Sequence, residues 1–175
     1  MRVLIKAGWL LLAAFCFGCS RNIPEKRGII DDGVIAGAES VQAWRTEASV
    51  NRVKGIDGGD YFKPTGDGVV LKLELAKSLV TILLSEESYP RPGGPVKACL
   101  PLPGVMIRFS KTGRYADVFI CFECEILILR TEADEKANAY GQSADFDPSH
   151  AELVKLAKAI FPTDSTIQSL KESRK

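Results

Sequence analysis

The chain has 175 residues, of which 23 are basic and 22 acidic, and it contains a single histidine. Arg2 and Lys6 lie in the first 18 residues, so the remainder carries 21 basic and 22 acidic side chains and is close to neutral. This balance lacks the positive patch that binding to nucleic acid or anionic lipid requires. We therefore predict no nucleic-acid partner. A chain of this length forms one core, so we also predict a single domain.

The first 18 residues have the order of a secretory signal peptide. Arg2 and Lys6 give a positive start, an apolar run follows from residue 7 to residue 17, and Gly18 stands at the expected cleavage point. The run is shorter than the roughly 20 apolar residues that a transmembrane helix needs. Residues 1–18 are therefore predicted to be a signal peptide, and the protein is predicted to be exported.

Gly18 and Cys19 resemble the lipobox of bacterial lipoproteins, in which the cysteine becomes the mature N-terminus and carries acyl chains such as palmitate. The family usually has Leu and then Ala or Ser before the glycine, where this chain has Cys16 and Phe17. Two or more acyl chains anchor firmly, because each buried CH₂ contributes about 0.8 kcal/mol. Ser20 resembles the outer-membrane class. The alternative is cleavage by an ordinary signal peptidase, which gives a soluble secreted protein.

The next segments read as a tether followed by a folded domain. Residues 19–38 are polar or rich in glycine, and we expect a flexible tether before a single domain over residues 39–175. Residues 39–46 alternate as in a strand, and a second strand is expected to begin near Tyr61, interrupted by a turn over residues 64–68. Apolar residues at three- and four-residue spacing between residues 71 and 87 predict a helix, which the following prolines end.

The stretch from Val96 to Thr131 predicts a β-hairpin with its turn at residues 111–114. In that register Arg108 lies opposite Asp117, and Ile107 lies opposite Val118. Residues 118–129 are almost continuously β-favouring and are treated as one strand. Its even-numbered apolar residues then share one face and its odd-numbered ones the other, which predicts a central strand covered by helices. The residues concerned are Val118, Ile120, Phe122, Ile126 and Ile128 on one face, and Phe119, Leu127 and Leu129 on the other.

The C-terminal part predicts a second helix packed on the sheet. Residues 132–146 read as a polar loop. Asp147 is expected to cap a helix that has Pro148 at its first position, and Pro162 is expected to stop it. A short helix is expected near residues 165–170. We therefore predict an α+β fold, in which a small antiparallel sheet with a central hairpin packs against two helices.

The cysteines after the leader predict one disulfide, because an exported chain meets an oxidising compartment. In a regular strand Cys121 and Cys124 are about 10 Å apart, beyond the roughly 7 Å limit for a bridge. The hairpin register brings Cys99 near Cys124. The first expectation is therefore a bridge between Cys99 and Cys124, the second is a bridge between Cys99 and Cys121, and one thiol is left over.

A zinc site formed by Cys99, Cys121 and Cys124 with His150 as the fourth ligand is the alternative. The single C-x-x-C, placed in a strand, favours instead no metal and no cofactor. A redox role needs the first cysteine of the motif at a helix N-terminus, which the strand position of Cys121 does not give. His150 falls in the first turn of a predicted helix, where an exposed histidine is common.

Catalytic signatures are missing from the sequence: it has no G-x-S-x-G, no phosphate-binding glycine loop and no H-E-x-x-H. We therefore assign no catalytic residue. The prediction is a non-enzymatic binding or structural module of the bacterial cell envelope, held to membrane lipid through Cys19. The alternative is a cysteine-dependent redox or zinc-binding envelope protein.

Several segments resemble a set of uncharacterised bacterial exported lipoproteins. The matching features are Cys99-x-Pro101, the ICFEC segment that ends at Cys124, and a helix that ends at Pro162. The similarity runs from about residue 39 to residue 171. In those proteins an Arg-His pair often follows the proline, where this chain has Leu102 and Pro103. The resemblance implies export and lipidation, and it implies no activity.

Overall fold

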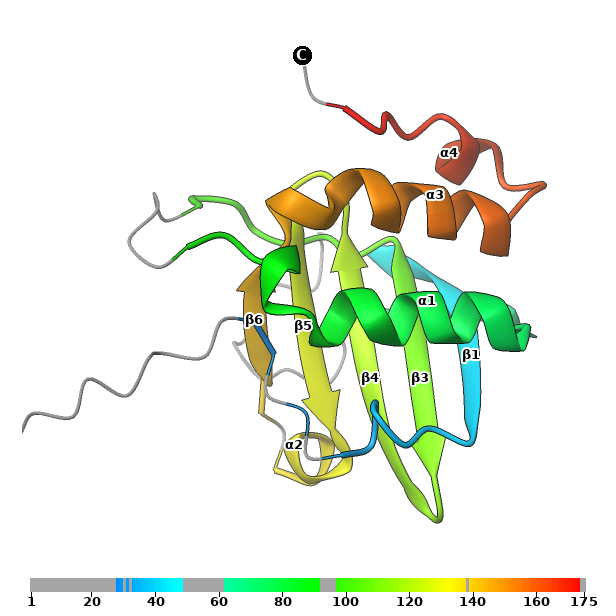
Figure 1. Ribbon diagram of the computed structural model, residues 1–175, viewed down its shortest axis with the longest axis vertical. Coiled ribbons are helices and arrows are strands. Elements are labelled where there is room, and N and C mark those ends of the chain that lie inside the picture. Colours follow the sequence, from blue (N-terminus) through cyan, green and yellow to red (C-terminus); the bar gives the residue numbers. More distant parts are fainter. Residues whose placement is uncertain are drawn as a thin grey trace, which may run out of the picture.

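The computed structural model describes residues 28–29, 31, 33–48, 62–91, 97–137 and 139–173. Within them the chain forms a six-stranded antiparallel sheet in the order β2-β1-β3-β4-β5-β6. The two longest helices, α1 (Leu73–Leu84) and α3 (His150–Ile160), lie across one face of this sheet (Figure 1). The predicted α+β class, with a central hairpin and two helices packed against an antiparallel sheet, is confirmed.

The remaining elements are short, and several match the sequence expectations. The strand expected over residues 39–46 and the helices expected near residues 71–87 and 165–170 are present. The second strand runs from Phe62 to Val70, and Pro64 is tolerated because β2 is an edge strand. The expected interruption appears as a bulge in its pairing with β1, between the Arg45–Thr65 and Ala43–Val69 pairs, where Gly66 has a φ of 67°. The bounds are β1 (Ser40–Ala48), β2 (Phe62–Val70), β3 (Val105–Lys111), β4 (Arg114–Cys121), β5 (Ile126–Thr131), β6 (Gln142–Asp145), α2 (Glu132–Lys136) and α4 (Ser165–Gln168).

The central hairpin has the register that its side chains predict. Arg108 pairs with Asp117, and Ile107 pairs with Val118. The two residues of the tight turn, Thr112 and Gly113, both have positive φ, at 39° and 76°. Such turns match the right-handed twist of the flanking strands. Opposite charges and apolar side chains therefore face each other across β3 and β4.

The prediction of one strand over residues 118–129 is wrong. A turn over residues 122–125 separates β4 from β5, and Glu125 adopts a left-handed φ of 54° there. Because the chain reverses, the face assignment of the second half is exchanged. Leu127 and Leu129 join Val118 and Ile120 beneath the helices, whereas Ile126 and Ile128 share the opposite face with Phe119.

The polar loop expected over residues 132–146 contains two elements. The helix α2 begins after Thr131, whose hydroxyl accepts a hydrogen bond from the main-chain N–H of Asp134 while the Asp134 carboxylate binds the main-chain N–H of Thr131. This capping box stabilises a helix of only five residues. The strand β6 then pairs with β5 and forms the edge of the sheet.

The main core lies between the sheet and the helices, and a smaller apolar cluster lies on the other face. Leu79 and Leu83 of α1 and Leu153 and Val154 of α3 are almost fully buried against the inner side chains of the sheet. Burial of such side chains stabilises the fold by roughly 1.5–3 kcal/mol each. Both helices cover the same face, so the prediction of helices around the central strand holds for one side only. The other face carries Met106, Phe119, Cys121, Cys124, Ile126 and Ile128.

Part of the predicted tether belongs to the domain core. Ile29, Val34 and Ile35 are at most 3% exposed and pack into the main core. The Asp31 carboxylate accepts hydrogen bonds from the main-chain N–H groups of Ile35 and Ala36, which fixes the turn before β1. The glycine and charged residues of this segment predict a flexible chain. Burial of its apolar side chains against the core instead holds the segment in place. The rest of the tether, the signal peptide and Cys19 lie outside the described residues.

Among the described helices, none combines the length and the apolar character needed to cross a membrane.

Candidate functional site

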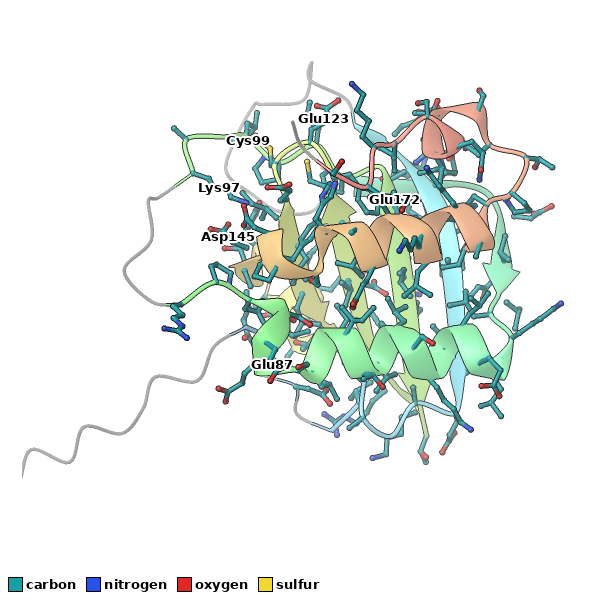
Figure 2. The ribbon with its side chains drawn as sticks, turned by 45° about the horizontal axis from the view of Figure 1, so that its top comes forward. Glu87, Lys97, Cys99, Glu123, Asp145 and Glu172 are labelled. Carbon is teal, nitrogen blue, oxygen red and sulfur yellow. A yellow bond between two sulfur atoms is a disulfide. The ribbon has the colours of Figure 1, made fainter. Side chains whose placement is uncertain are left out.

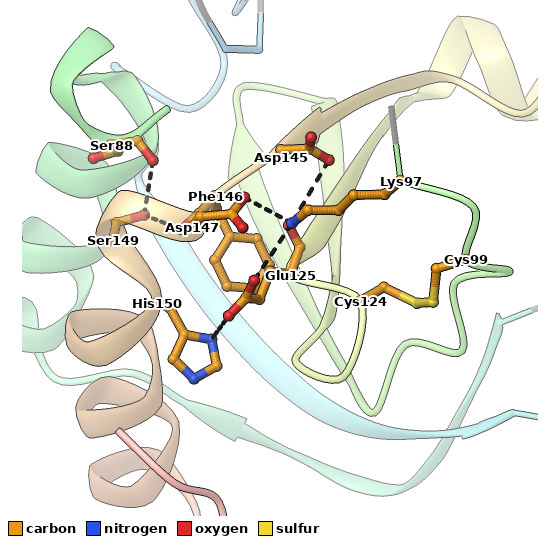
Figure 3. Close-up of polar contacts among 10 residues, drawn as sticks. All are labelled: Ser88, Lys97, Cys99, Cys124, Glu125, Asp145, Phe146, Asp147, Ser149 and His150. Atoms are coloured by element: carbon orange, nitrogen blue, oxygen red, sulfur yellow. Dashed lines mark hydrogen bonds and ion pairs between the residues drawn. A yellow bond between two sulfur atoms is a disulfide. The ribbon is translucent and has the colours of Figure 1, made fainter. Parts of the chain in front are cut away.

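Most of the residues that the sequence singled out meet at one end of the sheet. We call this the closed end and define it as residues 97–104, the β4–β5 turn at residues 122–125, and residues 145–150. Figure 2 shows Lys97, Cys99, Glu123 and Asp145 gathered there. The segments come from distant parts of the chain, so covalent and ionic contacts between them fix the geometry (Figure 3).

Cys99 and Cys124 lie at disulfide-bonding distance, with their Cα atoms 6.0 Å apart. The bond joins the segment before β3 to the β4–β5 turn. This is the pair that the hairpin register favours, although Cys124 is in a turn and not in a strand. The turn also changes the position of Cys124 relative to Cys121, since both belong to the apolar cluster on the face away from the helices.

Cys121 is the free thiol among the described cysteines and is 1% exposed. It is the last residue of β4, and its side chain packs in the second apolar cluster with Met106 and Phe119. A buried thiol in apolar surroundings behaves as a small hydrophobic side chain, and reactive cysteines are found in exposed, electropositive surroundings. The structure therefore gives Cys121 a packing role.

Lys97 connects the three segments of the closed end by ionic contacts. Its Nζ atom donates to Asp147 Oδ2 at 2.7 Å and to the main-chain oxygen of Glu125 at 3.2 Å, and it lies 3.5 Å from Glu125 Oε2. Asp145 Oδ1 is 3.9 Å away. The Lys97 side chain is 21% exposed, so these contacts are screened less than surface ion pairs.

Asp147 does not cap the helix as predicted, because its carboxylate binds Lys97. Residues 147–149 form a 3₁₀ turn with Pro148 near its start, and α3 begins at His150. Partial burial acts to raise the pKa of Asp147, but hydrogen bonds with Lys97 and Glu125 and the attraction of Lys97 outweigh it. The pKa of this carboxyl group is therefore held below its ordinary value of 3.8.

His150 is buried, contrary to the expected exposed position, and is 8% exposed. Its ring stacks on Phe146, with the ring planes 8° apart, and meets the edge of Phe122. The Nε2 atom lies 2.9 Å from the main-chain oxygen of Lys171, and Nδ1 lies 3.3 Å from Glu125 Oε1. The C-terminal segment and the β4–β5 turn thus hold the ring from both sides.

Both ring nitrogens of His150 lie near oxygen atoms, and the number of N–H groups on the ring limits which of them can donate a hydrogen bond. A neutral imidazole carries one N–H, so one nitrogen donates and the other accepts. With Nε2–H donating to the Lys171 oxygen, Nδ1 is the acceptor nitrogen. It has no hydrogen-bond partner within the described residues, although Glu125 Oε1 lies 3.3 Å away.

The alternative zinc ligands are not brought together by this arrangement. His150 packs with Phe122 and Phe146 of the helix-side core, whereas Cys121 lies in the cluster on the opposite face. Within the described part of the chain, no group of three or more His, Cys, Asp or Glu side chains has the geometry to hold a metal ion. The charged groups of the closed end bind one another and stabilise the fold.

A hollow at the opposite end of the sheet was not predicted from the sequence. It has a volume of about 400 Å³, lies beside the β3–β4 turn and is lined by Arg108, Lys111, Arg114 and Tyr115, together with Glu39, Ser40, Ser110, Thr112 and Gly113. We call it the hairpin hollow. Its sequence signal is the presence of three basic residues between positions 108 and 114, the segment that forms a tight hairpin.

Comparison with known proteins does not identify a relative: no family model, no curated protein and no solved structure matches this chain.

Proposed function

We propose that this chain is a bacterial cell-envelope lipoprotein, held to membrane lipid through Cys19, and that its domain is a non-enzymatic binding module. The observation that carries the proposal is the pairing of Cys99 with Cys124. Disulfides persist in oxidising compartments outside the cytoplasm, and the leader sequence predicts transport to such a compartment. The leader sequence and the disulfide are separate features of the chain, and both support a location outside the cytoplasm.

The side chains of the closed end support binding or structural work more than catalysis. Glu125 and His150 have the residue types of an acid–base pair, yet their side chains are 6% and 10% exposed and contact each other. A catalytic acid or base must reach a substrate directly or through one water molecule. The cysteine-dependent alternative receives less support, because Cys121 is buried and Cys124 is bonded to Cys99.

The attachment test is metabolic labelling of cells with a clickable palmitate analogue. The wild-type chain should be labelled and found with the outer membrane, whereas Cys19→Ala should carry no label. Cys16→Ala is the matched control, since it removes a neighbouring leader cysteine and should leave labelling unchanged. Equal labelling of the wild type and Cys19→Ala would contradict the anchor, and unlabelled soluble wild type would assign the leader to an ordinary signal peptidase.

A further inference from the structure

Three basic residues line the hairpin hollow, and one of them, Lys111, donates from Nζ to the main-chain oxygen of Gly33 at 2.9 Å. Arg108, Lys111 and Arg114 line it, and Glu39 is the acidic residue among the lining side chains. The Glu39 carboxylate is bound by Thr112, which donates from its main-chain N–H at 3.2 Å and from its hydroxyl at 2.7 Å. These bonds orient Glu39 toward the turn. The lining as a whole therefore favours an anion.

Arg108 is held in position before any ligand binds. Its Nε and Nη2 atoms donate to the two carboxylate oxygens of Asp117, each at 2.7 Å, and its guanidinium carbon lies 4.2 Å from the centre of the Tyr115 ring. Tyr115 is hydrogen-bonded to Glu135, which raises the pKa of the phenol to about 12. The tyrosine therefore stays neutral and provides a fixed aromatic surface for the guanidinium.

Arg130 stands on the other side of Asp117 without a matching acceptor. Asp117 pairs with Arg108 on β3 and with Arg130 on β5, so the three residues form one row across the sheet face away from the helices. Arg130 is 9% exposed. Its buried Nε and Nη2 atoms have no hydrogen-bond partner among the residues that the structure describes.

An unpaired buried guanidinium is unfavourable, because the charge has lost water without gaining an acceptor. Asp117 does not correct this in the structure, because its hydrogen bonds go to Arg108 and none joins it to Arg130 Nε or Nη2. If Arg108 released Asp117, the carboxylate would already have a second guanidinium as its neighbour. The cost of moving Arg108 is therefore lower than for an ordinary buried ion pair.

We propose that the hairpin hollow binds a phosphate group, and that Arg108 turns from Asp117 to the phosphate while Arg130 takes over Asp117. The proposal rests on the proposed function as a binding module and names its ligand class. Arginine forks match the geometry of phosphate oxygens, and lysine adds a point charge. The hydroxyls of Ser110 and Thr112 lie in the same lining and supply further donors.

The test uses the full chain, purified in a neutral detergent from whichever fraction contains it, and titrates it with inorganic phosphate by calorimetry at constant ionic strength. Arg108→Gln should weaken binding about tenfold or more, which corresponds to the loss of a charge-assisted contact. Lys77→Gln, on the exposed side of α1, is the matched control and should leave affinity unchanged. Acetate that binds as tightly as phosphate, or phosphate binding that Arg108→Gln leaves intact, would overturn the site.

Two further arms identify the source of the phosphate and the role of Arg130. Phosphatidylglycerol vesicles, compared with phosphatidylcholine vesicles, test a lipid headgroup, and free glycerol phosphate tests a soluble ligand. Arg130→Met should raise the thermal midpoint of the ligand-free protein yet weaken phosphate binding, because Asp117 then has no second partner. A change in the thermal midpoint with unchanged phosphate affinity would contradict the proposed change of partner of Asp117 from Arg108 to Arg130. None of these readouts depends on palmitate labelling, so failure of the anchor leaves the test intact.

Discussion

At the closed end Lys97 lies among the carboxylates of Glu125, Asp145 and Asp147, whereas at the other end three basic side chains surround the hairpin hollow. The closed end joins segments that are distant in sequence, and a disulfide reinforces it. The hairpin hollow is built mainly from one local turn and the start of β1. The difference teaches that charge density alone does not mark a site. The charged side chains of the closed end bind one another, whereas the lining of the hairpin hollow has three basic residues and one acidic residue.

The largest expected difference between the ends comes from the disulfide. Replacing both Cys99 and Cys124 by alanine should lower the free energy of unfolding by about 3 kcal/mol, because the bond closes a loop with a sequence separation of 25. Urea denaturation of the oxidised wild type and the double variant measures this change. The double variant is also its own control, since added reductant should not affect it. Equal urea midpoints for the two proteins would show that the bond does not constrain the chain.

Lys97→Ala should be the next most damaging change at the closed end. We expect a loss of about 2 kcal/mol, since Glu125 is left buried beside Asp147 without its cation. Lys136→Ala is the matched control: its ion pair with Glu132 is exposed on α2, and its loss should cost less than about 0.5 kcal/mol. Equal losses in the two variants would mean that the closed end is no more stabilising than a surface helix.

The loss of thermal stability at low pH should also depend on the charged groups of the closed end. Because the folded-state pKa of Asp147 lies below its ordinary value of 3.8, its contribution is present above that pH and is lost as the pH falls through the folded-state value. Thermal midpoints measured from pH 6 downward, at intervals of about half a unit, should therefore fall less steeply for Asp147→Asn than for the wild type. Parallel curves for the two proteins would show that the Asp147 carboxylate does not stabilise the folded state.

The smallest effect on stability is expected at the hairpin hollow. Arg114 is exposed in the tight hairpin, so Arg114→Gln should change the free energy of unfolding by less than about 0.5 kcal/mol. The same variant should weaken phosphate binding in the calorimetric titration. A large loss of stability would make the basic residues part of the scaffold, as at the closed end.

The sequence predicts the central hairpin well because its information is local. Alternation of apolar residues, a turn with Gly113, and the opposite charges of Arg108 and Asp117 all favour one register. The β4–β5 turn is missed for the same reason. Residues 122–125 contain no glycine, proline or asparagine, and the left-handed position is taken by Glu125. The contacts of Lys97 and Cys99 compensate for this unfavourable turn, and they are not local.

The candidate sites also depend on contacts between residues that are distant in the sequence, which local patterns do not reveal. The register argument points to Cys99 and Cys124, and the structure brings these two cysteines together through the unexpected turn. The burial of His150 depends on Phe122, Phe146 and the main chain of Lys171, which no spacing near residue 150 reveals. Arg130 reads from the sequence as an ordinary strand-end cation. Only the folded sheet places Asp117 between Arg108 and Arg130, and only there do the Nε and Nη2 atoms of Arg130 lack an acceptor within the described residues.

The contrast between the two ends is tested most directly by chemical-shift mapping of the isotopically labelled chain during titration with phosphate, against sodium chloride of equal ionic strength. Backbone amide signals from residues 108–115 should move, with a smaller response at Asp117 and Arg130, while residues 122–125 and 145–150 stay in place. Shifts confined to the closed end, or equal shifts with chloride, would contradict the assignment of the hairpin hollow as the binding end of the domain.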